Sequence, residues 1–557
     1  LREKIIYASS LTNGDAENFY GQAISVAPVS EKLYLSNLSQ NYSGEVKLEV
    51  ALQGLTTVNH QVKVKLNDQA VGTLSFKGQE RSVAELSVPS SALLEGENTV
   101  TLERFGGDSD VTLVDYIRLT YEHSYRADGN VLRFMAEGST RLDGFTYNNI
   151  RVMDISDPRR IAEIACSVEA SSNGYAATFQ AQGEREYLAF TDGEVNRPAS
   201  ILLDKPSNLK SSNNGADLVI ISYGDFIQSV QPLAELRRKE GLTVSVVDIQ
   251  DVYDEFSSGA HSPYAIKDFL SWAKSHWQNS PQFVLLVGDG SLDPRNYQGN
   301  GVTDFVPTKL IDASTMETAS DDWLADFNND GVAEMAVGRL PVRTKAEAER
   351  VISKIRGYTT GSAQQQVLMV VDRNNASDSF SFDKLGQELG VLVPSSITVR
   401  TINRGSTPDD STARTDIINA INEGPLMVNY IGHGSVEVWT GASILSASDI
   451  NALSNSNHLP VFVMMTCLNG YFPNPVRESL AEALLRDSGS GAVAVWASSG
   501  MTEPLAQSLM NKQFYQLVFG KDAMTLGAAV QKAKESTGDM DVRRTWILFG
   551  DPTMKLR

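Results

Sequence analysis

Apolar segments and amphipathic segments alternate from Asp217 to the end of the chain, and this alternation limits the possible folds more than any other feature. Runs such as 218–222 and 461–465 are almost entirely apolar, which is typical of strands buried on both faces of a sheet. Between such runs, residues 266–273 place apolar side chains three and four positions apart, as on one face of a helix. This order predicts a doubly wound α/β unit with a parallel sheet, helices on both faces and right-handed crossovers.

We expect the α/β unit to comprise two subdomains, 217–360 and 361–557. The predicted strands are 218–222, 244–247, 283–287, 334–337, 367–371, 397–401, 426–431, 461–465 and 492–496. The predicted helices are 232–240, 266–273, 345–358, 381–389, 413–422 and 479–486. Ligands bind such sheets beyond the carboxyl ends of the strands, so catalytic residues are expected there.

The first part of the chain has a different pattern. Residues 1–123 contain alternating apolar and polar positions, as in 62–67, with turn signals at short spacing. They predict a β-sandwich or jelly-roll module. Residues 124–206 predict a second, smaller β module, and the Ser- and Asn-rich stretch 207–216 predicts a linker.

The overall charge and the cysteine count exclude several classes of protein. Of 557 residues, 48 are basic and 68 acidic, a net charge of −20, which argues against nucleic-acid binding. With only two cysteines, the chain cannot form a cysteine-rich metal site. It contains no apolar run long enough for a membrane helix. Its first residues do not resemble a signal peptide, so we expect a mature or trimmed form.

A histidine and a cysteine follow two of the predicted strands. Strand 426–431 leads into Gly432–His433–Gly434, and strand 461–465 leads into Thr466–Cys467. If the strands are neighbours, both residues lie at one edge of the sheet. A thiolate is a strong nucleophile, and an adjacent imidazole can take its proton. The backbone N–H groups of Gly434 and Cys467 could then bind an oxyanion.

Each of these residues also has an ordinary structural interpretation. A cysteine after an apolar strand is usually a buried, inert residue, and an isolated histidine usually only satisfies local hydrogen bonds. The occurrence of both at strand ends, with glycines beside them, favours catalysis. We therefore expect Cys467 to be the nucleophile and His433 its base.

Four segments of the chain resemble the gingipain family of cysteine peptidases. They are NYIGHGS (429–435), TCLNGYF (466–472), AVGRLPV (336–342) and WILFGDPTMKLR (546–557), in the same order and at similar spacing. The resemblance covers about 217–557. It implies the caspase-like superfold, hydrolysis of protein substrates through a thioester, no organic cofactor, and a secreted or cell-surface bacterial enzyme.

The resemblance also implies two acidic residues at the site. In gingipains an acid at the end of an earlier strand orients the histidine, and Asp372 occupies that position, although the best-known members carry Glu. Arg-directed gingipains use a second acid slightly further along for a basic P1 side chain, and Asp383 matches it. Asp372 could instead form a turn, and Asp383 could instead favour the start of a helix.

A separate acidic segment predicts calcium binding. Asp326, Asn328 and Asp330 alternate before Gly331, as in the first half of an EF-hand loop, and Glu334 could supply a fourth ligand. The glutamate at the twelfth position of a complete EF-hand is missing. The alternative is a polar surface turn.

The sequence is also compatible with other functions. Relatives of the gingipains include sortase-like enzymes of type IX secretion, which remove a C-terminal sorting signal and join the new end to an amine. An inactive surface-binding protein is a further alternative, in which the N-terminal β modules contact carbohydrate or the cell surface. Those modules could also act as a propeptide, with activation by a cut near Ser211.

Overall fold

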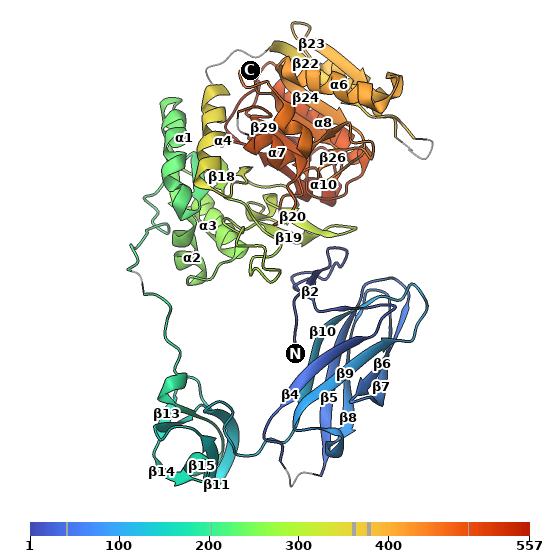
Figure 1. Cartoon of the computed structure of the whole chain (residues 1–557). Helices are drawn as coiled ribbons and strands as arrows, with labels where there is room; N and C mark the ends of the chain where they lie inside the picture. Colours follow the sequence, from blue (N-terminus) through green and yellow to red (C-terminus); the bar gives the residue numbers. More distant parts are fainter. Residues whose placement is uncertain (40–42, 202, 359–363, 376–379, 488, 557) are drawn as a thin grey trace. The chain divides into compact units, whose positions relative to one another are not determined.

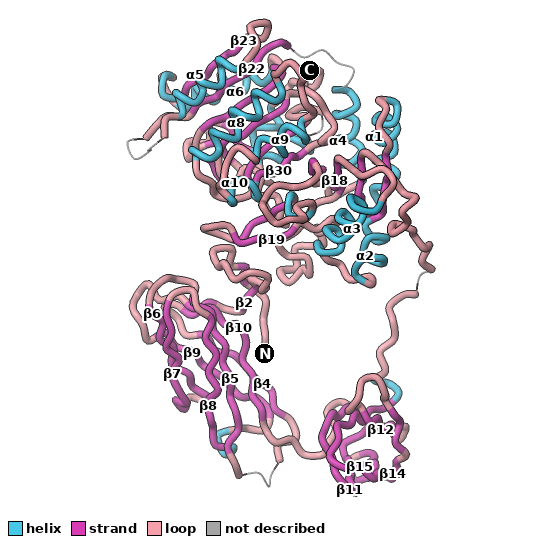
Figure 2. The backbone as a smooth tube through the Cα atoms, turned by 180° about the vertical axis from the view of Figure 1, so that it is seen from behind, coloured by secondary structure: helices cyan, strands magenta, loops and turns pink. Residues whose placement is uncertain are grey.

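The computed structural model describes residues 1–39, 43–201, 203–358, 364–375, 380–487 and 489–556. The chain separates into two compact units. The N-terminal unit is Leu1–Ala8 with Asn18–Asp204, and the C-terminal unit is Ser9–Glu17 with Lys205–Arg557. Figures 1 and 2 show that the N-terminal unit is built of strands, whereas the long helices belong to the C-terminal unit.

The first part of the N-terminal unit is a β-sandwich. Its described residues form two four-stranded antiparallel sheets, ordered β3-β10-β5-β8 and β4-β9-β6-β7. The strands are β1 Ile6–Tyr7, β2 Phe19–Tyr20, β3 Ala23–Ile24, β4 Val29–Leu35, β5 Glu45–Gly54, β6 Asn59–Leu66, β7 Gln69–Lys77, β8 Arg81–Pro89, β9 Gly96–Arg104 and β10 Thr112–Thr120. In β6 the apolar side chains of Val62, Val64 and Leu66 are fully buried, so alternation along the strand builds the core between the sheets.

A second β module completes the N-terminal unit. Its strands are β11 Val131–Phe145, β12 Ile150–Asp154, β13 Ala162–Ile164, β14 Cys166–Ser171 and β15 Gly174–Thr191. They form one antiparallel sheet around the long strand β15, which pairs with β11, β12 and β14. Its separate core includes Phe145, Phe179 and Tyr187.

The Ser- and Asn-rich segment predicted as a linker packs against the C-terminal unit. Leu209 is buried, its N–H donates to the Glu255 carboxylate, and its carbonyl accepts from the Trp277 indole. Leu209 supplies the apolar contact, and the Glu255 carboxylate accepts the backbone hydrogen bond. Residues 207–216 therefore form part of the C-terminal unit and not a free connection.

The core of the C-terminal unit is a sheet that contains ten strands within the described residues, in the order β17-β16-β18-β21-β30-β29-β28-β24-β22-β23. The strands are β16 Leu218–Ser222, β17 Val244–Asp248, β18 Phe283–Val287, β21 Ala336–Leu340, β22 Gln364–Val371, β23 Thr398–Asn403, β24 Pro425–Ile431, β28 Val461–Met465, β29 Ala494–Ser498 and β30 Trp546–Phe549. Short strands outside it are β19 Lys309–Asp312, β20 Glu317–Ser320, β25 Gly434–Ser435, β26 Val438–Trp439 and β27 Leu445–Ser446.

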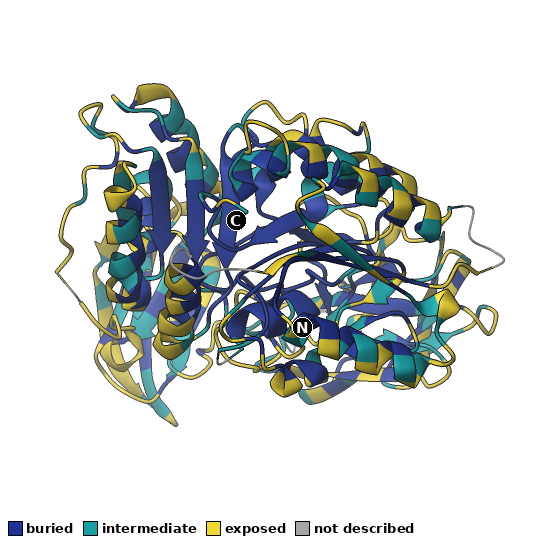
Figure 3. Ribbon diagram, turned by 90° about the horizontal axis from the view of Figure 1, so that it is seen from above, coloured by how far each residue is buried: buried dark blue, intermediate teal, exposed yellow. Residues whose placement is uncertain are grey.

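Helices cover both faces of this sheet, as the apolar runs predict. They are α1 Ile227–Lys239, α2 Ile249–Ser257, α3 Pro263–His276, α4 Lys345–Tyr358, α5 Phe382–Leu392, α6 Asp410–Asn422, α7 Leu480–Arg486, α8 Pro504–Val518, α9 Leu526–Lys534 and α10 Met540–Thr545. In β16, Leu218 and Ile220 face the core under α1 and α4, whereas Val219 and Ile221 face the core under α2 and α3. Figure 3 shows the buried strands between partly exposed helices.

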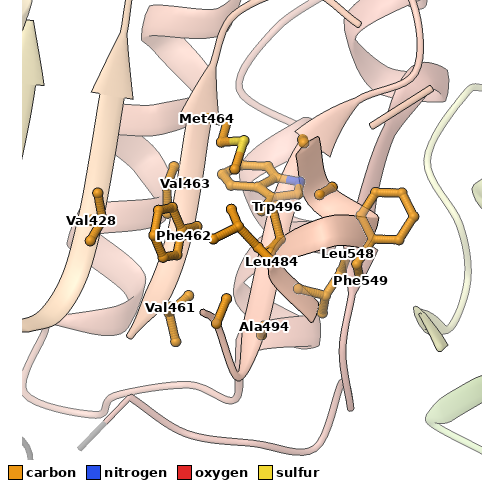
Figure 4. Close-up of a cluster of buried hydrophobic side chains, with 14 of the residues drawn as sticks. Val428, Val461, Phe462, Val463, Met464, Leu484, Ala494, Trp496, Leu548 and Phe549 are labelled. Atoms are coloured by element: carbon orange, nitrogen blue, oxygen red, sulfur yellow. The ribbon is translucent and has the colours of Figure 1, made fainter. Parts of the chain in front are cut away.

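The two halves of the sheet run in opposite directions. Strand β30 is parallel to β21 on one side and antiparallel to β29 on the other. The two predicted subdomains therefore share one continuous sheet, and the carboxyl ends of their strands face opposite edges. The predicted boundary at 360/361 lies outside the described residues. Figure 4 shows the core at the junction, where Phe462, Trp496, Leu484 and Leu548 lie together.

A short N-terminal segment also belongs to the C-terminal unit. In Ser9–Glu17, the carbonyl of Ser9 accepts from Glu317 N–H at 2.7 Å, and Gly14 N–H donates to the Asp312 carboxylate at 2.7 Å. These bonds attach the segment to the β19–β20 hairpin.

Candidate active site

His433 and Cys467 follow neighbouring strands at matching positions. Strands β24 and β28 are parallel, and Ile431 at the end of one is paired with Met465 at the end of the other. His433 and Cys467 each come two residues later. Neighbouring strands are about 4.8 Å apart, so the expectation that both residues lie at one edge agrees with this register.

The loops that carry the two residues are packed directly against each other. Gly432 N–H donates to the carbonyl of Met465 at 3.2 Å. A Cβ atom at Gly434 would lie 2.4 Å from Thr466 Oγ1 and 3.3 Å from the Cys467 carbonyl oxygen. Gly434 is therefore needed for the close approach of the two loops.

Cys467 lies in a partly buried environment that disfavours the charged thiolate. Cys467 is half-buried, and its Sγ lies 3.8 Å from the carbonyl oxygen of Thr502. Burial raises the pKa of the Cys467 thiol, and the charge of Glu503 raises it further. The next residue, Leu468, has φ 61°, a left-handed conformation that costs energy for a leucine and that often occurs at functional sites.

The His433 segment is held from several sides while the residue itself stays exposed. Its carbonyl accepts from Tyr430 Oη at 2.6 Å and from Thr440 N–H at 2.8 Å. Its imidazole packs against the Phe382 ring in a T-shaped contact, with ring centroids 5.3 Å apart and an interplanar angle of 88°. Phe382 begins α5, so the start of this helix lies beside the imidazole.

Asp372 lies at the same edge and contacts the backbone of His433. It follows β22, the other neighbour of β24, and is buried with 1% of its surface exposed. Its carboxylate accepts from His433 N–H at 3.3 Å and from the guanidinium of Arg404 at 2.9 Å. Arg404 follows β23, the next strand, and also pairs with Asp410. In sheet order, the ends of β28, β24, β22 and β23 are thus followed by Cys467, His433, Asp372 and Arg404.

Asp383 lies in the first turn of α5, next to Phe382. It is half-buried, and Asn403 Nδ2 donates a hydrogen bond to its carboxylate. Its position near His433 is compatible with a substrate contact, and its place in the first turn is compatible with the structural alternative. Its role in substrate binding stays a prediction.

The predicted calcium loop is stabilised by its own polar groups. The carboxylate of Asp326 accepts from the N–H groups of Asp330 and Gly331, and Glu334 accepts from Phe327 N–H. Asn328 Oδ1 also accepts from Asp330 N–H at 2.8 Å. No three His, Cys, Asp or Glu side chains in the described part of the chain are arranged to hold a metal ion. Calcium binding at this loop stays a prediction.

Three residues that sequence reasoning did not assign complete the site. Arg404 neutralises the buried Asp372, and Tyr430 supports the carbonyl of His433. Asn469 Nδ2 donates to the carbonyls of Ser435 and Val438, in the hairpin that follows His433. Tyr430 and Asn469 lie within the motif segments, and Arg404 follows a predicted strand, so the strand-end rule could have found it.

The chain is similar in sequence to proteins of a known peptidase family. The sequence profile of Peptidase family C25 matches residues 211–557. Gingipain R2 of Porphyromonas gingivalis is 24% identical over 523 residues, 87% of this chain and 66% of the relative. Gingipain R1 of the same species is 25% identical over 551 residues, 89% of this chain and 50% of the relative. The chain thus spans two-thirds or less of the length of these relatives.

Solved structures show the fold. The Arg-specific cysteine proteinase gingipain R (RGPB) superposes with a TM-score of 0.52 and 22% identity, covering 64% of this chain and 80% of that one. Dimeric latent PorU from Porphyromonas gingivalis superposes with a TM-score of 0.53 and 17% identity, covering 100% of this chain and 53% of that one. The α/β fold shared with these structures and the preceding all-β region agree with the sequence-based prediction.

Proposed function

Since the chain belongs to peptidase family C25, we propose that it is a cysteine endopeptidase in which Cys467 attacks a peptide bond and His433 transfers the protons. The observation that carries this proposal is the matched position of the two residues beyond the paired ends of β24 and β28. The four motif segments support it, because two of them contain His433 and Cys467.

The reaction proceeds through a thioester. Cys467 Sγ attacks the carbonyl carbon of the scissile bond while its proton passes to the His433 imidazole. The tetrahedral intermediate collapses, the C–N bond breaks, and the imidazolium gives its proton to the departing amine. Water then attacks the thioester, His433 takes a proton from it, and the carboxylate product leaves with the thiol restored.

The raised pKa of Cys467 indicates which role His433 has in the first step. A thiol whose pKa burial raises is mostly protonated at neutral pH, so the thiolate must form during the attack. The imidazole therefore acts as a general base in the first step and not only as a counter-ion. The carbonyl of Thr502 lies close enough to hold the S–H in the resting state.

Two backbone N–H groups are suited to the oxyanion. Gly434 pairs with Trp439 in the β25–β26 hairpin, next to the ladder bond from Thr440 N–H to His433. Hydrogen-bonded and non-bonded pairs alternate in an antiparallel ladder, which favours an outward direction for the Gly434 N–H. The Cys467 N–H makes no hydrogen bond within the described residues. Such donors stabilise the developing negative charge.

The proposed substrate is a protein segment with Arg or Lys before the cleaved bond. Asp383, beside the Phe382 ring that contacts His433, would pair with the basic side chain. The relative RGPB is described as Arg-specific, which supports this preference. Cleavage of a peptide library only after uncharged residues would contradict it.

The proposed location is the cell surface or the outside of a bacterial cell, in line with the gingipain and PorU relatives. No helix in the described part of the chain is long and apolar enough to cross a membrane. Latency is a related proposal, since the full-length similarity is to a latent form of PorU. Residues 207–216 pack on the C-terminal unit, so exposed positions such as Ile201 and Leu203 are better placed for an activating cut than Ser211.

Transpeptidation is the alternative outcome of the same chemistry. The thioester can pass its acyl group to an amine instead of water, and the Cys467 site would serve both reactions. The exposed carboxylate of Glu503, whose charge affects the thiol, could attract an incoming ammonium group. Ligated product in the presence of an added amine would favour this reaction over hydrolysis.

The chain contains a matched control for the principal test. We expect Cys467→Ala to lower kcat/KM on fluorogenic peptides with Arg, Lys or Leu before the cleaved bond by more than about 1,000-fold. Cys166→Ala, at the half-buried cysteine of the N-terminal unit, should retain activity within about threefold and leave the Tm of the C-terminal unit unchanged. Equal activity of the two variants would refute the assignment of Cys467.

A further inference from the structure

Asn469 connects the segment that contains Cys467 to the hairpin that follows His433. It lies two residues after Cys467 and is fully buried. Its Nδ2 atom donates to the carbonyl oxygens of Ser435 and Val438, one from each strand of the β25–β26 hairpin. A single side chain therefore spans the two loops that must act together.

The contacts determine the orientation of the Asn469 amide. Both neighbours of Nδ2 are carbonyl oxygens, which only accept, so the NH₂ group and not the oxygen must face them. The backbone of Asn469 is also fixed, because its N–H donates to the Cys467 carbonyl at 2.8 Å and its carbonyl accepts from Ala481 N–H at 3.0 Å. The amide is thus a rigid bridge from the Cys467 loop.

The bridge is not needed for the strands themselves. Strands β24 and β28 pair along their whole length, from Met427 with Val461 to Ile431 with Met465. Beyond these ends the backbone is irregular, and the position of the hairpin relative to Cys467 depends on loop contacts. The contact of Gly434 with Thr466 sets the shortest possible distance between the two loops. The two hydrogen bonds of Asn469 prevent the loops from moving further apart.

We propose that Asn469 is a positioning residue that holds the His433 hairpin at the distance and angle at which the imidazole can take the Cys467 proton. This inference rests on the proposed peptidase function. Proton transfer requires donor and acceptor within hydrogen-bond reach. Burial raises the pKa of the Cys467 thiol, so formation of the thiolate depends on this alignment. The Asn469 side chain is fully buried and bonds to backbone carbonyls, so it acts through the hairpin and not on the reacting atoms.

Two substitutions at Asn469 and one control distinguish a loss of alignment between the two loops from a general loss of stability. Asn469→Ala removes both hydrogen bonds, and Asn469→Asp keeps the shape but places a carboxylate oxygen against two carbonyls. Asn455→Ala is the control: Asn455 is also buried, exchanges hydrogen bonds of 2.8 and 2.9 Å with Gly491, and lies before β28, at its other end. It removes a comparable pair of bonds far from the thiol.

The readouts are kcat and KM for peptide cleavage, Tm, and the rate at which iodoacetamide alkylates Cys467 as a function of pH. We expect Asn469→Ala to lower kcat about 100-fold with KM changed less than about threefold, the effect of misplacing a reacting group by about 1 Å. Its alkylation at pH 7 should fall to the rate of His433→Ala. Asn455→Ala should lower Tm while keeping kcat and alkylation within about threefold of the unmodified protein.

Asn469→Asp adds a test that does not depend on the alanine variant folding. The carboxyl introduced by this substitution can donate a hydrogen bond when it is protonated. The activity of the Asn469→Asp variant, relative to that of the unmodified protein, should therefore rise as the pH falls from 8 to 5. Alkylation of Asn469→Ala at the unmodified rate, or a relative activity of Asn469→Asp that is constant with pH, would overturn the inference. If the unmodified chain cleaves no peptide, the proposed function fails, and the alkylation comparison with His433→Ala still decides the role of Asn469.

Discussion

Gly434→Ala is expected to separate the two loops that contain His433 and Cys467. The added Cβ would lie 2.4 Å from Thr466 Oγ1 and 3.0 Å from Thr466 Cγ2. Ordinary contacts between such atoms are about 3.5 Å, so the loops must move apart by about 1 Å. Overpacking of this kind costs about 1–3 kcal/mol of stability. A displacement of about 1 Å between reacting groups lowers the rate about 100-fold.

Thr466→Ala provides the compensating change. The Thr466 hydroxyl is buried and has no hydrogen-bond partner among the described residues, so its removal leaves no donor or acceptor unpaired. It also removes the two nearest of the three atoms that the new Cβ would meet, and leaves the Cys467 carbonyl oxygen at 3.3 Å. We expect the single variant Thr466→Ala to lose about 1 kcal/mol of stability through its missing methyl group, with kcat/KM nearly unchanged.

The assay is kcat/KM on a fluorogenic peptide, together with the free energy of unfolding in urea. Gly434→Ala alone should lose about 100-fold in kcat/KM, and the double variant with Thr466→Ala should recover at least about tenfold of that loss. If Gly434→Ala retains activity within threefold, or the double variant is no better than the single one, the close approach of the loops does not control the chemistry.

Three further predictions concern charged groups. Asp372→Asn removes the buried partner of Arg404 and should lower the free energy of unfolding in urea by about 2–3 kcal/mol. Asp410→Asn, at a more exposed partner of the same arginine, should lower it by less than about 1 kcal/mol. Equal losses in the two variants would contradict the importance of burial. Burial raises the pKa of Asp304 to about 7, so between about pH 4 and 7 the folded state binds this proton and the unfolded state does not. Its contribution to stability is therefore lost as the pH rises towards 7, and Asp304→Asn should flatten the fall of Tm between pH 5 and 8; an unchanged slope would refute this. If the 326–331 loop binds calcium, Tm should rise on addition of the ion after chelation and should not rise in Asp326→Asn with Asp330→Asn. A Tm of the unmodified protein that does not respond to calcium would count against the site.

The positions of the principal residues could be predicted because they depend on local pattern. The apolar runs 426–431 and 461–465 agree with β24 and β28, apart from one residue at the start of β24. Because these strands are buried on both faces, the sequence shows them as unbroken apolar runs. The residues after them, His433 and Cys467, then follow from the rule that parallel strands place their functional groups at the carboxyl edge.

Predictions made from local composition alone were less reliable. The Ser- and Asn-rich segment 207–216 looks like a linker, yet Leu209 and Glu255 attach it to the C-terminal unit. The partner that decides this structure lies in another segment of the chain, which composition does not identify.

Sequence determined nine of the ten described strands of the main sheet and the all-β character of the first part, because each of these depends on which side chains avoid water. It predicted neither β30 nor the helices α2, α8, α9 and α10. Tertiary structure alone decided that β30 reverses the direction of the sheet, that Arg404 neutralises Asp372, and that Asn469 connects the two loops. The physical reason is that a buried charge or amide must find its partner wherever packing brings one within about 3 Å, and packing joins residues far apart in the chain.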